Sequence, residues 1–172
     1  MKSAAVLALV TAVAAGCSSQ HATRMAVAPG GSKSTLSVLP CRASQLRPHL
    51  YLQGATGKLL GGIAFAVTAS NPCLLTGPPR VSLAGAPASV RWRIYPMRPL
   101  SGGRPIHTIR RGDRVVVDLS WSNWCANSAP QSFVIALPRG GGGFRARVPG
   151  TPRCDVPTQP SELGVGPFTA SR

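Results

Sequence analysis

Acidic residues are almost absent from this 172-residue chain, which has four of them against 19 lysines and arginines, and its formal net charge is +15. A hydrolytic site needs a nucleophile, a base and an orienting group together, and four carboxylates leave few combinations. The Gly-x-Ser-x-Gly signature of α/β-hydrolases is also missing. Ser132, His107 and Asp118 can be drawn as a triad, but nothing in their spacing favours it. We therefore expect no enzyme, and a hydrolase ranks third among the functional readings.

Metal-ligand motifs are lacking as well. The chain has three histidines, none with a second ligand two or four residues away, and no Cys-x-x-Cys pair. Structural and catalytic metal sites need clustered ligands. We expect neither a metal nor another cofactor.

Long apolar runs are missing, and the one run present is short. Met1 and Lys2 precede twelve largely apolar residues, 4–15, which are too few to span a bilayer stably and are typical of a signal peptide. The run ends in Ala-Ala-Gly-Cys at residues 14–17, which resembles the lipobox of bacterial lipoproteins. That resemblance implies a diacylglyceryl group on Cys17, and Ala14, where leucine is usual, leaves ordinary signal cleavage as the alternative.

The chain thus divides into three parts. Residues 1–16 are the expected signal peptide, residues 17–38 a lipidated cysteine with a flexible Ser/Ala/Gly-rich tether, and residues 39–172 one folded domain. We expect the domain on the extracytoplasmic face of the membrane, held by the lipid. The sequence gives no oligomeric state.

Helix-forming patterns are scarce, since the chain contains 19 glycines and 17 prolines. Short segments with period-two alternation instead predict strands over residues 48–53, 61–71, 90–96, 114–121, 132–138 and 144–148. We expect the alternate positions of each segment, such as Trp92 and Ile94, to face the core. The number and size of these segments favour an all-β, two-sheet, immunoglobulin-like sandwich.

The segment Trp-Ser-Asn-Trp-Cys at 121–125 can be interpreted in two ways, as an aromatic binding site or as a corner of the scaffold. Trp121 continues the inward parity of its strand, Trp124 leaves it, and Asn123 lies at the strand end, where its side chain suits the capping of backbone groups. The corner is our prediction.

Four further segments are distinctive: "CRASQLRPHL", "VTASNPCLLTGPPRVSL", "LSWSNWC" and "FVIALPRGGGGFRARV". Together they resemble a secreted actinobacterial lipoprotein domain of unknown function, and the likeness covers nearly all of residues 41–172. The gap between Asn71 and Cys73 is shorter than the family's usual one. The resemblance implies export, frequent lipid anchoring and a β-sandwich, and it implies no activity.

Apart from Cys17, the chain has four cysteines, an even set that predicts two disulfides in an exported protein. Four cysteines permit three pairings. The sequential one, Cys41–Cys73 with Cys125–Cys154, closes the shortest loops and is the pairing we predict.

Arginine, at 16 of the 19 basic residues, is the main functional lead. Two outward pairs and a turn cluster would form a cationic stripe if their strands shared one sheet: Arg91 and Arg93; Arg145 and Arg147; Arg110, Arg111 and Arg114. Guanidinium groups bind phosphates and carboxylates in a bidentate manner.

We expect a non-catalytic binding or structural module in the envelope, with anionic lipids or wall polymers rather than nucleic acid as partners. The competing interpretation is that the arginine-rich surface reflects the composition of the chain and has no binding function. A small-ligand carrier with an apolar pocket between the sheets is the second functional reading.

Overall fold

A computed structural model of the protein describes residues 37–100 and 102–171. The predicted signal peptide, Cys17 and nearly all of the predicted tether lie outside the described residues. Among the described residues, no helix is long and apolar enough to cross a membrane.

The described residues form strands and two short 3-10 turns, with no α-helix among them. The elements are η1 (Ala43–Gln45), β1 (Leu46–Ala55), β2 (Lys58–Val67), β3 (Cys73–Leu74), β4 (Arg80–Ala84), β5 (Trp92–Pro96), β6 (Thr108–Ile109), β7 (Arg114–Ser122), β8 (Ser132–Ala136), η2 (Pro138–Gly140), β9 (Gly143–Arg147) and β10 (Ser161–Ala170).

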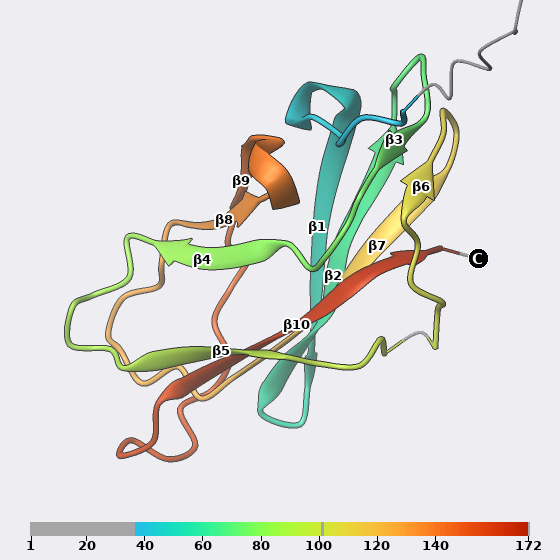
Figure 1. Ribbon diagram of the computed structural model, residues 1–172. Helices are drawn as coiled ribbons and strands as arrows, with labels where there is room; N and C mark the ends of the chain where they lie inside the picture. Colours follow the sequence, from blue (N-terminus) through green and yellow to red (C-terminus); the bar gives the residue numbers. More distant parts are fainter. Residues whose placement is uncertain (1–36, 101, 172) are drawn as a thin grey trace, which may run out of the picture. The chain divides into compact units, whose positions relative to one another are not determined.

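The strands build two main sheets and a small ribbon (Figure 1). One sheet has five strands in the order β1-β2-β7-β10-β5, the other has three in the order β4-β8-β9, and β3 pairs with β6. Aromatic contacts join the two main sheets: the Trp121 ring meets Phe133 at 5.5 Å, and Phe65 meets Phe144 at 5.6 Å between centroids. The predicted all-β, two-sheet sandwich is confirmed.

All six predicted strands are present, with ends that differ by a few residues. The core residues of β7 are where the alternation placed them, since Val115, Val117, Leu119 and Trp121 are fully buried. The outward positions of β9, Arg145 and Arg147, are exposed. Alternation was therefore a sound guide wherever one face of a strand meets the core.

For β5, the sequence predicted correctly which side chains face inward, but those side chains are less buried than predicted. Trp92 and Ile94 pair with the buried Ser161 and Leu163 of β10 and so share their inward face. Ile94 is nevertheless 43% exposed and Trp92 only half-buried. The physical reason is position, because β5 is the edge strand of the five-stranded sheet and has a sheet neighbour on one side only.

Sequence reasoning missed β10, a central strand of the larger sheet. It pairs antiparallel with β7 and parallel with β5. A register shift between Val165 and Phe168, at Gly166 and Pro167, breaks the alternation there. Proline and glycine inside a strand are found mainly at such bulges, so they look like turn residues in a sequence. The short β4 was also missed, although Val81 and Leu83 alternate with outward residues in it.

Candidate functional site

The two tryptophans of the Trp-Ser-Asn-Trp-Cys segment lie inside the domain. Trp121 is 0% and Trp124 3% exposed, and their rings meet edge to face at 5.3 Å. Each indole N–H has an acceptor: Trp121 donates to Ser161 Oγ at 2.9 Å and Trp124 to the Ser128 carbonyl at 3.0 Å. Neither ring is available to a ligand, so the segment is a corner of the scaffold and not an aromatic binding site.

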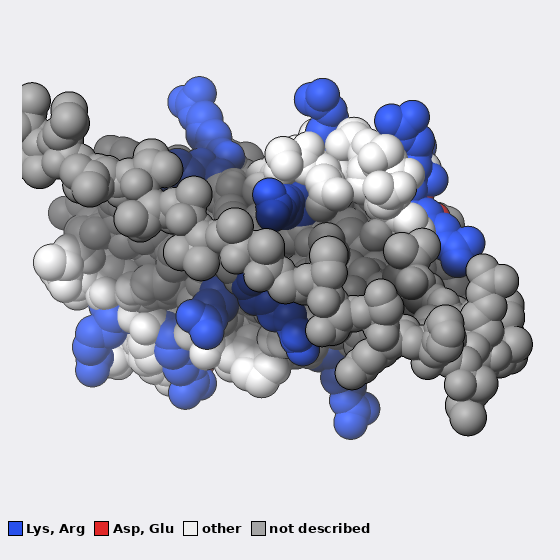
Figure 2. Space-filling view, turned by 45° about the horizontal axis from the view of Figure 1, so that its top comes forward, with Lys and Arg blue, Asp and Glu red and all other residues white. Residues whose placement is uncertain are grey.

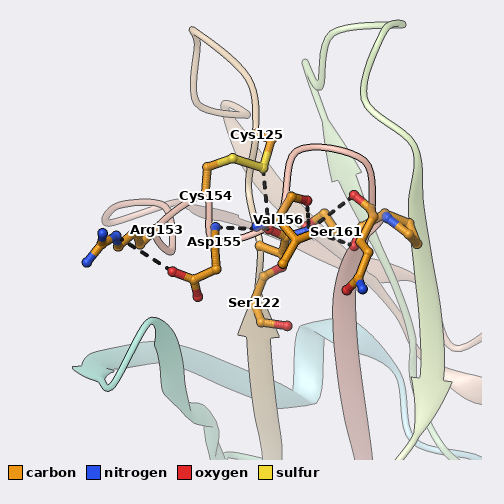
Figure 3. The surroundings of a disulfide bond; sticks show 10 residues. Ser122, Cys125, Arg153, Cys154, Asp155, Val156 and Ser161 are labelled. Atoms are coloured by element: carbon orange, nitrogen blue, oxygen red, sulfur yellow. Dashed lines mark hydrogen bonds and ion pairs between the residues drawn. A yellow bond between two sulfur atoms is a disulfide. The ribbon is translucent and has the colours of Figure 1, made fainter.

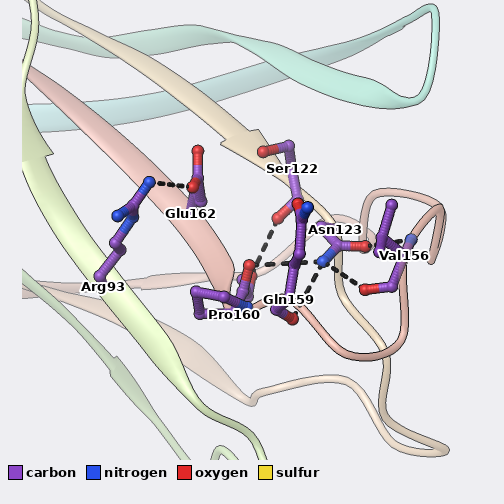
Figure 4. A network of polar contacts seen from close by, with 8 residues as sticks. Arg93, Ser122, Asn123, Val156, Gln159, Pro160 and Glu162 are labelled. Carbon is purple, nitrogen blue, oxygen red and sulfur yellow. Dashed lines mark hydrogen bonds and ion pairs between the residues drawn. The ribbon is translucent and has the colours of Figure 1, made fainter.

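Asn123 organises this corner, as Figure 4 shows. Its Nδ2 donates to the carbonyls of Val156 at 2.9 Å and Gln159 at 3.1 Å, with Pro160 at 3.3 Å. Its Oδ1 accepts the backbone N–H groups of Asp155 at 3.1 Å and Val156 at 2.9 Å. One side chain thereby fixes the loop that leads into β10. The capping role predicted from its place at the strand end is confirmed, but its partners come from a loop far along the chain.

The disulfides have the predicted pairing. Cys41–Cys73 joins the start of the domain to β3, and Cys125–Cys154 joins the residues after β7 to the loop before β10. The second bond lies beside the Asn123 network (Figure 3). Asn123 and this disulfide therefore hold the same loop at two points.

The four outward arginines of the predicted stripe do not share a sheet. Arg93 belongs to β5 of the five-stranded sheet and Arg91 precedes it, whereas Arg145 and Arg147 belong to β9 of the three-stranded sheet. The shared-sheet condition for one stripe is therefore not met. The reason is topological, since period-two alternation gives the face of a strand but not its neighbours.

The first arginine pair is also engaged within the protein. Arg93 forms an ion pair with Glu162 of β10, and Arg91 donates from Nη2 to the Thr158 carbonyl at 2.6 Å. These contacts occupy part of the charge and donor capacity that the prediction assigned to a partner.

The turn cluster stands apart from both pairs. Arg110 and Arg111 lie between β6 and β7, and Arg114 begins β7. Asp113 lies in the same turn, where its Oδ2 accepts the backbone N–H of Arg110 at 2.8 Å. In the view of Figure 2, basic side chains project along two opposite margins.

A different arginine joins Arg145 and Arg147. Arg80, on β4, has the outward parity because Val81 and Leu83 are buried. Strand β8 lies between β4 and β9, and its Val134 pairs with both Ser82 and Arg145. Arg80, Arg145 and Arg147 therefore share the outer face of the three-stranded sheet, which we call the arginine face. The alternation in "RVSLA" was the signal that could have found Arg80.

All the charged residues of the arginine face are basic. Between the arginines lie Ser82, Ala84, Ser132, Val134, Ala136 and Gly143. These small side chains leave the long guanidinium-bearing ones exposed. All four acidic residues of the chain lie outside β4, β8 and β9. Among the described residues, no ion pair involves any of the three arginines.

On the opposite outer face, a row of three residues crosses the five-stranded sheet. Tyr51, Gly62 and Asp118 are neighbours on β1, β2 and β7. Asp118 is 4% exposed, and its Oδ2 accepts the Leu100 N–H at 2.7 Å. Partial burial, and then the negative charge of Asp118, raise the pKa of Tyr51 above its ordinary value of 10.0. Asp118 thereby attaches the segment after β5 to the sheet.

The triad drawn from the sequence does not come together. Ser132 lies on the arginine face, and Asp118 lies on the outer face of the other sheet, so the sandwich separates them. His107 is exposed and precedes β6. In residues 37–100 and 102–171 there is also no group of three potential metal ligands.

The pockets on the surface of the described domain include two small ones. One has a volume of about 50 Å³ and lies at the tryptophan corner; the other, of about 90 Å³, is lined mainly by Pro78, Pro105, Ile106, Pro167 and Phe168. Sites for drug-sized ligands are about 300–1,000 Å³. Neither pocket has the volume expected of a small-ligand carrier.

Together these features define a β-sandwich with two disulfides and a basic outer face. Residues 41–169 match the family described as a domain of unknown function, DUF4232, and the chain belongs to that family. No curated protein and no solved structure matches the chain.

Proposed function

We propose that this protein is an exported module, anchored in the membrane through a lipid on Cys17, that binds the anionic headgroups of the membrane surface without catalysing a reaction. The observation that carries the binding proposal is the arginine face, with three exposed guanidinium groups and no acidic residue on its strands. The proposal of an anchor rests on the apolar run before Ala-Ala-Gly-Cys at 14–17.

The spacing of the arginines supports an extended anionic partner. Arg145 and Arg147 are alternate residues of one strand and so lie about 7 Å apart at their backbones. Arg80 lies two strands away and pairs through Ala136 with Gly143, two residues before Arg145, so the backbones of Arg80 and Arg145 are roughly 12 Å apart. The small side chains between them allow a headgroup layer to approach all three guanidinium groups. A tether of about twenty residues, 18–38, gives the face enough reach to meet the membrane to which the lipid attaches.

The binding proposal is tested with unlipidated Cys17→Ala protein and vesicles containing anionic phospholipid. Each arginine near such a surface contributes about 1 kcal/mol, so Arg80→Gln/Arg145→Gln/Arg147→Gln should weaken binding about 100-fold. Binding should also fall as salt is raised, because the Debye length is about 10 Å at 0.1 M.

The matched control removes the same charge from the turn cluster. The variant Arg110→Gln/Arg111→Gln/Arg114→Gln should retain binding within about tenfold, since Asp113 already offsets part of that charge. Equal losses in the two triple variants would mean that net charge, and not the arginine face, governs binding. Binding to a soluble phosphate polymer but not to vesicles would reassign the partner to wall polymers.

The anchor is tested separately by fractionation. Once exported and processed, the Cys17→Ala chain should leave the membrane fraction, because it lacks the two-chain lipid that gives stable attachment. Full retention of an exported, processed Cys17→Ala protein would overturn the anchor.

A further inference from the structure

A small polar pocket lies at the tryptophan corner, apart from the arginine face. Its volume is about 50 Å³, and Ser89, Arg91, Asn123, Cys125, Gln159 and Ser161 are among the residues that line it. We call it the corner pocket. It forms where the residues after β7, the segment before β5 and the loop before β10 converge.

Arg91 is held in place at this pocket. Its Nη2 donates to the Thr158 carbonyl at 2.6 Å, on the loop before β10. A guanidinium group has five N–H donors, so this bond orients the group and leaves most of its donors for a ligand. An oriented guanidinium loses less conformational entropy when it binds an anion than a freely moving one does.

The other polar groups that line the pocket are of two kinds. Some are already hydrogen-bonded within the protein, and others can donate to a ligand. Asn123 Nδ2 is committed to loop carbonyls, and Ser161 Oγ bonds both Trp121 Nε1 and the Ser122 carbonyl. The side chains of Ser89 and Gln159 make no hydrogen bond with the described residues and are exposed. Both can donate to an oxygen ligand.

Charge and size then restrict the ligand. The lining contains one arginine and no acidic residue, so the pocket favours a negative group. A volume of about 50 Å³ corresponds to roughly three to five water-sized positions, which matches the few heavy atoms of one carboxylate or phosphate group.

We propose that the corner pocket binds a compact oxyanion, a carboxylate or a phosphate group, with Arg91 as its charged ligand and Ser89 and Gln159 as further donors. This site is independent of the arginine face and does not rest on the proposed membrane function.

The test is a titration of the full Cys17→Ala chain with inorganic phosphate and, separately, with acetate, at constant ionic strength set with sodium chloride. Saturable NMR shifts should be confined to residues 89–91, 123–125 and 157–161. Saturation by phosphate alone or by acetate alone identifies which oxyanion the pocket selects. Arg91→Gln should weaken binding at least tenfold, because a hydrogen bond to a charged group is lost.

Arg93→Gln is the matched control. It removes the same charge two residues away, but Arg93 does not line the pocket and pairs with Glu162. Its affinity for the anion should stay within twofold of the parent protein. Equal affinities in the two variants would overturn the site, and unsaturable shifts at many arginines would indicate an adventitious ion only. Either failure leaves the vesicle experiment unaffected.

Discussion

Replacing Asn123 tests whether one amide side chain holds the tryptophan corner together. The Asn123→Ala change removes two bonds accepted by Oδ1 and the two shorter bonds donated by Nδ2. Each contributes about 1 kcal/mol net, which gives about 4 kcal/mol. Asn123 also has a φ of +57°, in the left-handed region that costs an ordinary residue about 1–2 kcal/mol and that asparagine tolerates better.

The expected total is thus about 4–5 kcal/mol, a large share of the 5–15 kcal/mol that stabilises a typical domain. Asn123→Gly separates the two contributions, because glycine lacks the side-chain bonds but adopts positive φ without strain. It should be less damaging than alanine by about 0.5–1 kcal/mol, after allowance for the greater freedom of glycine in the unfolded chain.

The assay is urea unfolding followed by tryptophan fluorescence, since Trp121 and Trp124 are buried beside Asn123 and become exposed on unfolding. A loss below about 1 kcal/mol for Asn123→Ala would refute the network as a source of stability. A glycine variant less stable than the alanine variant would refute the contribution of backbone strain.

Two further predictions concern the row of Tyr51, Gly62 and Asp118. NMR of the Tyr51 ring should give a pKa above 10.0, so the stability that this raised pKa supplies is present below pH 10 and is lost as pH rises through the folded-state value. Asp118→Asn should lower that pKa only in part, because burial is the larger cause; an unshifted pKa in the parent protein would contradict this account. Gly62→Ala should destabilise the domain by about 1–3 kcal/mol in urea, since its Cβ would lie 2.6 Å from the Val117 carbonyl oxygen, whereas Gly54→Ala meets no atom within 4 Å. Equal stabilities of the two glycine variants would rule out steric crowding at Gly62.

Local pattern in the sequence determined which face of most strands is buried. The alternation in Val115, Val117 and Leu119 gave the core face of β7, because successive side chains of a strand point to opposite sides whatever its neighbours are. The even cysteine set and its sequential spacing likewise gave both disulfides, Cys41–Cys73 and Cys125–Cys154.

Only the tertiary structure decided which strands lie side by side. In the sequence, Arg80, Arg93 and Arg145 all occupy outward positions of their strands. Strand order places Arg80 and Arg145 on the two strands that flank β8, and it places Arg93 in the other sheet. Long-range pairing also fixes β10 as a central strand in spite of Gly166 and Pro167. The backbone partners of Asn123 lie more than thirty residues along the chain, between Asp155 and Pro160. No local periodicity encodes such neighbours, because they depend on how the sheets close around a shared core.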